Sequence, residues 1–462
     1  MIKPLLLWSD ILIFILVASV GLFLRQISKN PQAKKRWRRV FSSKVGIAAF
    51  IIICTYVSVA LLDSVHFRYA LDNVEKSTET SYSSEVHSLL DVALDDLKSM
   101  NEKTYSAPFA IYSFSKENLE DEQGRIYRDY PRLQSAGTHL ADESEKVADI
   151  SMKLVFGLLK GLAAAALLVA GHIFWRRKTK VPGDEKLADI PWATAYITLA
   201  VICCIIAVVL QLGNYYHILG TDKVGQDVLY TSIKAIRTGV LIGTLATILT
   251  LPIAIFLGIS AGYFKGWIDD LIQYVYTTLS SIPSILLIAA SVLLIDVYIA
   301  NNPDLFELTL ERADFKFLAL CGILGMTSWT TLCRLLRAET LKVSQLDYVQ
   351  AAHAFGVSHM RVIGKHILPN ITHIILIALV LDFSAFVLAE AVLAYIGVGV
   401  DPSMVSWGNM INGARSELSR DPAVWWSVTA AFIMMFTLVL AANLFSDEVR
   451  EAFDPRSAKG ES

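Results

Sequence analysis

The sequence predicts an all-α polytopic membrane protein. Its 462 residues are 54% hydrophobic, a higher fraction than a soluble chain of this length needs. Apolar runs recur along the chain, and a helix of about 20 apolar residues crosses the hydrocarbon of a bilayer. Pro283 lies in a weakly polar stretch and predicts a bend in the sixth run. The nine expected spans are Leu5–Leu24, Val45–Leu62, Met152–Phe174, Ala193–Leu212, Gly239–Tyr263, Leu271–Leu294, Phe317–Leu335, Ile371–Val398 and Trp425–Leu444.

The distribution of Lys and Arg sets the expected orientation. The loops Arg25–Lys44 and Trp175–Lys180 are strongly basic, and basic loops stay in the cytoplasm. The segment 63–150 lies between them across two spans, so it should be external. It contains 18 acidic and 9 basic residues, a balance that fits the translocated side. Alternation of the remaining spans then puts the N-terminus outside and the C-terminus in the cytoplasm.

A polar stretch with proline and glycine, Lys180–Pro191, divides the chain. Three spans and the external segment precede it, and six spans follow it. The expected parts are an N-terminal extension (1–180) containing the acidic external segment (63–150), a cytoplasmic linker (181–192), a transmembrane domain (193–446) with a loop at 347–370, and a cytoplasmic tail (447–462).

The external segment is the least informative part of the sequence. Ser84–Met100 has apolar residues at helical spacing, and Thr104–Phe114 is expected to be extended or looped. Two interpretations stay open, a small folded domain and an ordered lobe packed on the spans. Its role is equally open: it holds an external partner near the pore, or it stabilises the added helices.

The sequence contains no motif typical of a catalytic site, a metal site or a disulfide framework. All five cysteines fall in expected spans, so neither a disulfide framework nor a zinc site is indicated. No glycine-rich phosphate loop ending in Lys-Ser/Thr and no nucleophile elbow occurs, so the chain should not itself bind ATP or act as an enzyme. Thr221 and Asp222 are expected to cap a surface helix rather than to bind metal.

Pairs of small residues four apart recur in the expected spans. They are Gly157/Gly161, Gly239/Gly243 and Gly258/Gly262. Such pairs let membrane helices approach closely. We therefore expect helix packing at these positions rather than ligand binding.

The connector Asp347–Ile371 is too long and too basic for a simple turn between spans. Asp347 is expected to cap a short helix, and Gly356 permits a turn after it. A second helix is expected over Ser358–Ile367, and Pro369 fits the start of the following span. The pattern leaves two interpretations open: a knob for a cytoplasmic partner, or an amphipathic helix that lies on lipid head groups.

Three histidines lie in this connector, at His353, His359 and His366. Gly356 should break the helix between the first two. The last two would lie about 10 Å apart along a helix axis, too far to share one ion. Solvated or head-group-facing histidines are therefore expected.

The connector resembles the EAA loop of ABC-importer permeases. The chain has Gln350-Ala351-Ala352, then Gly356, then Leu368-Pro369, at the spacing of that loop. Gln350 replaces the usual Glu, and His366 stands where an aliphatic residue is common. The resemblance implies a coupling helix that docks on an ATPase, with the contacting positions Tyr348, Gln350, Ala351, Ala352, Phe355, Gly356, Leu368 and Pro369.

Further segments resemble the dipeptide/oligopeptide/nickel permeases of the second, "C" type. They occur in family order across about 191–456. Gln226 and Lys265 depart from the family pattern, where Arg and Gly are usual. The segments are Leu219–Leu229, Gly258–Asp270, Ser280–Ala289, Arg334–Leu341, Glu390–Val400, Ser406–Ile411 and Glu448–Arg456.

This resemblance implies a type I permease core of six helices, preceded here by three extra spans. It implies a bacterial inner-membrane subunit that imports peptides or similar small solutes. The implied partners are a second permease chain, two cytoplasmic ATPases that hold ATP and Mg, an external substrate-binding protein and membrane lipid; no nucleic acid and no cofactor on this chain are expected. The external family motif maps to Gly220, Thr221, Asp222, Gly225 and Asp227.

Two acids lie inside the eighth expected span, Asp382 and Glu390. A charge at membrane depth usually faces a cavity or a partner. Glu390 is a candidate for the translocation path, and the alternative is a hydrogen bond between helices, which we favour.

Two other functions compete with the importer. A membrane sensor would use the external segment between two spans, but no output domain follows it. An ion-driven transporter predicts several buried charges and an internal repeat; one convincing buried acid and no repeat are found.

Overall fold

The computed structural model describes residues 2–29, 31–70, 82–120, 124–179, 190–306 and 308–453. Residues 181–189 of the expected linker and 454–462 of the expected tail lie outside this range, as do 71–81 and 121–123 of the external segment.

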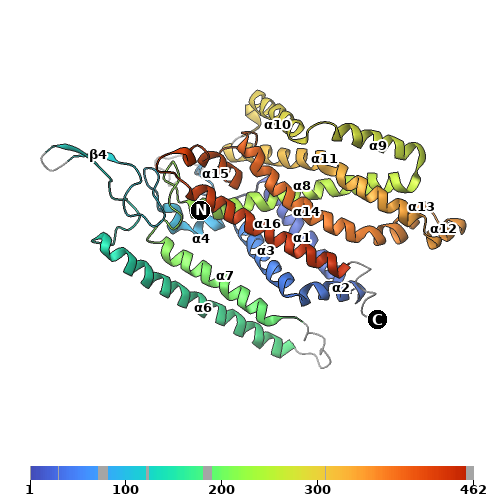
Figure 1. Cartoon of the computed structure of the whole chain (residues 1–462), viewed down its shortest axis with the longest axis horizontal. Helices are drawn as coiled ribbons and strands as arrows, with labels where there is room; N and C mark the ends of the chain where they lie inside the picture. Colours follow the sequence, from blue (N-terminus) through green and yellow to red (C-terminus); the bar gives the residue numbers. More distant parts are fainter. Residues whose placement is uncertain are drawn as a thin grey trace. The chain divides into compact units, whose positions relative to one another are not determined.

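Eight helices of the described chain are long and apolar enough to cross a membrane (Figure 1). They are α3 (Lys44–Asp63), α6 (Lys146–Thr179), α7 (Trp192–Gly213), α8 (Val228–Phe264), α10 (Ser284–Asn301), α11 (Thr309–Ser344), α14 (Leu368–Tyr395) and α16 (Trp426–Phe453). The first expected span corresponds to α1 (Trp8–Lys29), but its apolar part, Trp8–Leu22, is shorter than the other spans.

The sixth expected span, Leu271–Leu294, is not one helix. Helix α9 (Gly266–Ser280) ends before Pro283, and α10 begins at Ser284. Proline disfavours a helical conformation in the residue before it and lacks an amide donor. The expected bend is confirmed, whereas the candidate span itself is shifted to Ser284–Asn301.

The contacts group the chain into two compact units, and each contains residues from both sides of the linker. The first unit comprises Met1–Leu6, Phe41–Thr238 and Val405–Leu438. The second comprises Leu7–Val40, Gly239–Met404 and Val439–Ser462.

The first unit contains the external segment as a lobe of short elements. A three-stranded antiparallel sheet joins β1 (Ile2–Leu5), β2 (His66–Tyr69) and β3 (His87–Ser88), with Ile2 opposite Tyr69. Strands β4 (Glu117–Glu120) and β5 (Ile126–Asp129) form a separate hairpin. The expected helix over Ser84–Met100 is two short helices, α4 (Leu89–Ala93) and α5 (Asp95–Ser99), and a 3-10 turn, Glu143–Glu145, leads into α6.

Apolar side chains of this lobe pack on the adjoining ends of the membrane helices. Leu90, Leu94 and Leu97 contact Leu229 and Tyr230 of α8. The lobe therefore lies against the spans, which is the second of the two interpretations left open by the sequence.

Helices α6 and α7 lie side by side in the same unit (Figure 1). A Cβ atom at Gly157 would lie 2.9 Å from the Cα of Val208, and one at Gly161 would lie 2.5 Å from the Cα of Cys204. The expected close packing at this glycine pair is confirmed.

The second unit packs α8, α11 and α14 closely. A Cβ at Gly243 would lie 2.6 Å from the ring of Phe383, and one at Gly258 would lie 2.8 Å from the carbonyl oxygen of Cys333. Helix α1 contacts α11, where the backbone amide of Ser9 donates to Asp314 Oδ2 at 3.1 Å.

The remaining helices of the chain are short or amphipathic. Trp37 of the basic helix α2 packs edge-on against Phe453, with ring centroids 5.5 Å apart. These helices are α2 (Pro31–Ser42), α12 (Asp347–Ala354), α13 (His359–Val362) and α15 (Trp407–Ala414), with 3-10 turns at Pro303–Leu305 and Glu417–Ser419.

We expect the substitution Gly161→Val to weaken the α6–α7 pair, because the new side chain meets backbone atoms that cannot rotate away. Overpacking of this kind costs roughly 1–3 kcal/mol. SDS-induced unfolding of the purified chain in micelles measures the loss. Gly171→Val, on the same helix with no heavy atom within 4 Å of its Cβ, is the control; equal losses in the two variants would contradict the packing.

Candidate functional site

The connector between α11 and α14 begins with helix α12. Its N-cap residue is Leu346, and no side chain caps it. The expectation that Asp347 caps this helix is therefore wrong, because Asp347 is already helical. Its carboxylate lies in the first turn, where negative charge interacts favourably with the helix dipole.

Gly356 ends this helix as expected. Its φ is +70°, which glycine adopts without steric cost. The amide of Gly356 donates to the carbonyl of His353 at 2.9 Å, and the amide of Val357 donates to Ala352 at 3.1 Å. These bonds satisfy carbonyls that the helix end would otherwise leave open.

Helix α12 has one inner and one outer face. Val349 is fully buried, and Ala352 packs partly buried against the same apolar cluster. Tyr348, Ala351 and Phe355 are exposed on the other face, and Phe355 is 86% exposed. Five of the eight expected contact positions, Tyr348, Gln350, Ala351, Phe355 and Gly356, therefore lie in the exposed part of this helix and turn, whereas Ala352 faces inward.

The second expected helix, Ser358–Ile367, is not one regular helix. Helix α13 covers His359–Val362, and a π-helical turn covers Ile363–Ile367. Pro369 has no amide donor, and its ring clashes with the carbonyl four residues earlier. The wider π turn precedes this proline, which sits in the first turn of α14 as expected; Leu368 packs partly buried against the cluster around Val349.

Two connector histidines meet at Tyr263, at the end of α8. The Tyr263 hydroxyl lies 3.0 Å from Nε2 of His353 and 2.9 Å from Nδ1 of His359. The third, His366, contacts the ring of Tyr348. Both of the first two side chains are exposed, as expected. The turn at Gly356 also folds the connector back and brings them together at Tyr263, which the sequence did not predict.

Tyr263 belongs to the segment Gly258–Asp270, which follows the family pattern. Lys265 has a φ of +57°, which explains why glycine is usual at this position. Beyond it, the carboxylate of Asp269 in α9 binds Arg337 of α11 through two bonds of 2.5 and 2.7 Å. The α8–α9 corner is thus joined to both the connector and α11.

The external motif forms a loop between α7 and α8 that is bonded to the extension. The hydroxyl of Thr221 donates to the carbonyl of Thr104 at 2.8 Å, and it accepts the amide of Ser106 at 2.6 Å. Gly220 has a φ of +67°, and a Cβ there would lie 2.4 Å from the carbonyl oxygen of Ser106. Only glycine fits this approach.

The rest of the motif shapes the same loop. Asp222 accepts the amides of Val224 and Gln226, both at 2.9 Å. The Gly225 carbonyl accepts the Glu102 amide at 2.9 Å. The expected helix cap at Thr221 and Asp222 is therefore wrong: both residues belong to the loop. Asp227 caps α8 instead, because its Oδ1 accepts the amide of Tyr230 at 3.0 Å.

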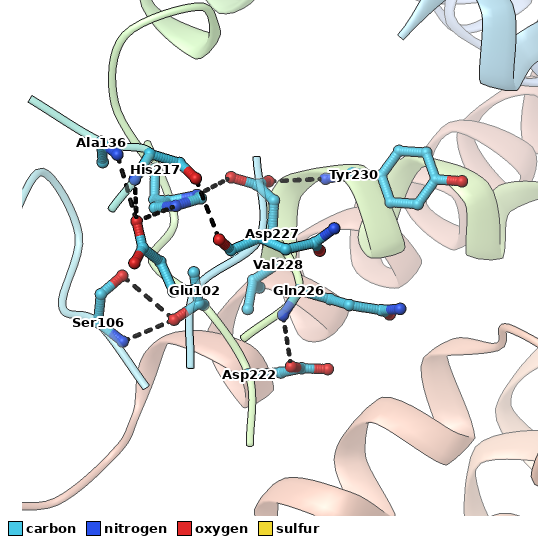
Figure 2. Close-up of polar contacts among 12 residues, drawn as sticks. Glu102, Ser106, Ala136, His217, Asp222, Gln226, Asp227, Val228 and Tyr230 are labelled. Carbon is cyan, nitrogen blue, oxygen red and sulfur yellow. Dashed lines mark hydrogen bonds and ion pairs between the residues drawn. The ribbon is translucent and has the colours of Figure 1, made fainter. Parts of the chain in front are cut away.

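Asp227 also holds a buried histidine (Figure 2). Its Oδ2 lies 2.7 Å from Nδ1 of His217, and Glu102 Oε1 lies 3.7 Å from Nε2 of the same ring. Glu102 in turn accepts three backbone amides, from Gln134, Ser135 and Ala136. His217 is 0% exposed, so the extension contributes one of the two carboxylates around a buried ring.

The two carboxylates determine the charge of this ring. Burial alone lowers the pKa of His217, but the hydrogen bond to Asp227 and the nearby carboxylate of Glu102 outweigh it and raise the pKa to about 9. Burial likewise raises the pKa of Glu102, whereas His217 and the three amides lower it to a net value below the usual one. The site is therefore a buried imidazolium between two carboxylates.

A second polar cluster joins the lobe to the same face of α8. The ammonium of Lys234 pairs with Asp91 and lies 3.5 Å from Asp63. The Tyr230 hydroxyl donates to Asp91 at 2.8 Å. The sequence did not predict roles for these residues, for His217 or for Glu102. The available signal was the pair of charged residues, Lys234 and Arg237, just before the fifth expected span.

No group of three or more His, Cys, Asp or Glu side chains that could hold a metal ion occurs in the described ranges. Asp222 and Asp227 in particular are engaged in the loop and the helix cap.

The two acids of α14 have different surroundings. Glu390 is buried in the second unit. Asp382 lines a cavity of about 600 Å³ between α11, α14 and the end of α16. Glu390 does not line this cavity, so its place on a translocation path stays a prediction.

We expect the lobe that contains Glu102 to lose stability as the pH rises. His217 titrates near 6.5 when unfolded and near 9 when folded, so its contribution is complete below the first pH and is lost as the pH rises through the second. Each unit of pKa shift corresponds to about 1.4 kcal/mol. Limited proteolysis of the lobe across this range measures the effect.

The variant His217→Gln should remove this pH dependence, whereas His87→Gln, in the same lobe, should keep it. An unchanged pH profile in His217→Gln would contradict the buried imidazolium.

Comparison with known proteins identifies the family. A model described as "Binding-protein-dependent transport system inner membrane component" matches residues 254–459. The oligopeptide transport system permease protein OppC of Mycobacterium tuberculosis (strain ATCC 25618 / H37Rv) is 32% identical over 248 residues, which are 54% of this chain and 79% of that protein. The glutathione transport system permease protein GsiD of Pectobacterium atrosepticum is 29% identical, over 52% of this chain and 73% of the relative.

A di/tripeptide transport system permease protein, DppC of Pseudomonas aeruginosa, is 30% identical over 54% of this chain and 75% of its own length. These matches confirm the resemblance to the "C"-type permeases, the type I permease core and the multi-pass inner-membrane location. The chain therefore belongs to the family of binding-protein-dependent transport system inner membrane components, and it is a permease subunit of an ABC importer rather than an enzyme.

Proposed function

We propose that this permease imports peptides or similar small solutes and forms half of the translocation path. A second permease chain completes the path, and an external substrate-binding protein delivers the cargo. Two cytoplasmic ATPases hold ATP and Mg and drive alternation between inward- and outward-facing states. The names of the relatives, which transport oligopeptides, di- and tripeptides and glutathione, support this substrate class.

The observation that carries the coupling role is the two-faced helix α12. Its inner face is fixed by Val349 in the apolar cluster, while Phe355 is 86% exposed at the turn. Leu346, Tyr348 and Met360 of the same segment are also exposed, by 44%, 46% and 79%. Several large apolar side chains exposed on one short segment are typical of a protein–protein interaction site. An ATPase groove is the partner that we propose.

The coupling helix transmits motion through Tyr263. The hydroxyl of this residue contacts histidines on both sides of the turn, and the adjacent Asp269–Arg337 pair joins α9 to α11. A displacement of α12 therefore reaches α8 and α11 through polar contacts as well as through the apolar cluster.

We propose an external N-terminus and a cytoplasmic C-terminus. Strand β1 pairs with β2 of the acidic segment, so the chain before α1 lies on the same side as that segment. The basic loop between α1 and α3 then lies in the cytoplasm, in agreement with the rule for Lys and Arg. In this orientation the lobe stabilises the external ends of α7 and α8.

We expect Phe355→Ser to reduce co-purification of the ATPases about tenfold or more, since it removes the exposed apolar anchor; tenfold corresponds to about 1.4 kcal/mol. Affinity purification of the tagged chain from membranes with quantified ATPase recovery measures this. Trp175→Ser, which removes an exposed aromatic from the extension, is the control. Retention of ATPase by Phe355→Ser and by Ala351→Asp would overturn the docking face.

We expect Tyr263→Phe to keep the ATPases bound but to lower transport per ATP hydrolysed. The change removes a hydroxyl that contacts two histidines, and each such bond contributes about 0.5–1.5 kcal/mol. The ratio of uptake to ATP hydrolysis in proteoliposomes measures it. Tyr274→Phe, exposed on α9, is the matched control, and an unchanged ratio in Tyr263→Phe would exclude the proposed transmission.

A further inference from the structure

The cavity of about 600 Å³ in the second unit is lined mainly by one face of α14 and one face of α11. On α14 it is lined by His373, Ile374, Ile377, Ala378, Leu381 and Asp382. On α11, Thr331, Leu335 and Glu339 are four residues apart and share one helix face. Arg450 of α16 adds a third side.

The polar residues of this cavity lie at two depths. The first level is close to the helix ends next to the connector. It contains Glu339 near the end of α11, His373 near the start of α14 and Arg450 near the end of α16. Asp382 lies 14 residues into α14, which is about 21 Å along the axis at 1.5 Å per residue. Thr331 lies at a similar depth, about 20 Å before the end of α11. In a hydrocarbon layer of about 30 Å, this depth lies well inside the membrane.

The walls between these two levels are apolar. Leu335 of α11 and Ile377, Ala378 and Leu381 of α14 line the intervening part. Glu339 and Arg450 both line the cavity at the level next to the connector. This level therefore contains charges of both signs and favours neither cationic nor anionic ligands. The inner level contains one ionisable group, Asp382, among the residues that line the cavity.

The carboxylate of Asp382 is incompletely satisfied. Its Oδ2 atom is buried and has no hydrogen-bond partner among the described residues. An aspartate in the middle of a membrane helix costs about 2.5–3.5 kcal/mol, and an unpaired buried acceptor adds to this cost. A cationic ligand in the cavity would offset both terms.

We propose that Asp382 binds the positively charged group of the transported solute, an ammonium such as the free amino terminus of a peptide, at the inner end of this cavity. This inference rests on the proposed import function and names a specificity determinant within it. The volume of about 600 Å³ is in the range of pockets that hold small-molecule ligands. A charge-assisted bond to a primary ammonium would also orient a peptide with its amino end innermost.

The test uses the assembled transporter, purified without nucleotide and without the external binding protein. Binding of a labelled tripeptide with a free amino terminus is compared with binding of its N-acetylated form by equilibrium dialysis. Asp382→Asn should weaken binding of the free amine about tenfold or more and should change binding of the acetylated form less than about twofold. Asp382→Glu should recover part of the affinity.

Asp296→Asn, which removes a membrane-helix acid outside the cavity that pairs with Lys316, controls for a general effect of losing an acid. Recovery of the second permease and the ATPases with Asp382→Asn controls for assembly. Equal weakening for both peptides, no weakening, or loss of assembly would each overturn the assignment.

Uptake by cells separates this inference from the proposed function. If deletion of the chain leaves peptide uptake unchanged, the peptide-import function itself fails. If uptake depends on the chain, but the Asp382→Asn transporter binds the free and the acetylated peptide as tightly as the unsubstituted transporter does, the import function stands and the ammonium site is wrong.

Discussion

The pairing of His217 with Asp227 and Glu102 determines where the lobe of the extension meets the membrane helices. Asp227 caps α8 and Glu102 belongs to the extension, so one buried ring joins the two. An unpaired buried charge is strongly unfavourable, and this makes the arrangement specific: moving Glu102 would leave the imidazolium short of a counter-charge. The glycines at 220 and 225 let the extension backbone approach closely enough for this pairing.

The lobe also covers the first turns of the long helix α8. A helix of 37 residues is about 55 Å long, far more than the hydrocarbon requires. Its first turns carry Lys234 and Arg237, which lie outside the expected span Gly239–Tyr263. The lobe covers this end: Lys234 pairs with Asp91, and Arg237 Nε donates to the Ser64 hydroxyl at 3.3 Å. The extension thus supplies hydrogen-bond and ion-pair partners for these polar residues, which lipid hydrocarbon could not supply.

Much of this architecture could be predicted from the sequence, for reasons that can be stated residue by residue. Hydropathy located the spans because each helix must satisfy its backbone internally, whatever its neighbours are. Gly356 and Pro369 located the turn and the next helix because their effects are local. Three features could not be predicted because each depends on chain segments far apart in the sequence. They are the cap at Asp227, the contact of His353 and His359 with Tyr263, and the His217 site. Asp227 and Asp222 are equally good cap candidates until the loop closes on Ser106.

The two acids of α14 illustrate the same limit within one helix. From the sequence, Glu390 and Asp382 are both charges at membrane depth, and family resemblance drew attention to Glu390 alone. Their separation of eight residues is a little more than two helical turns, so they project in directions about 80° apart. That angle is enough for one to line the cavity while the other is buried in packing. Which acid lines the cavity depends on how α14 is rotated about its axis, and close contacts such as that of Gly243 in α8 with Phe383 restrict this rotation. Gly243, which is far from Asp382 in the sequence, is thus coupled to the position of that charge through Phe383, the residue that follows Asp382 in the chain.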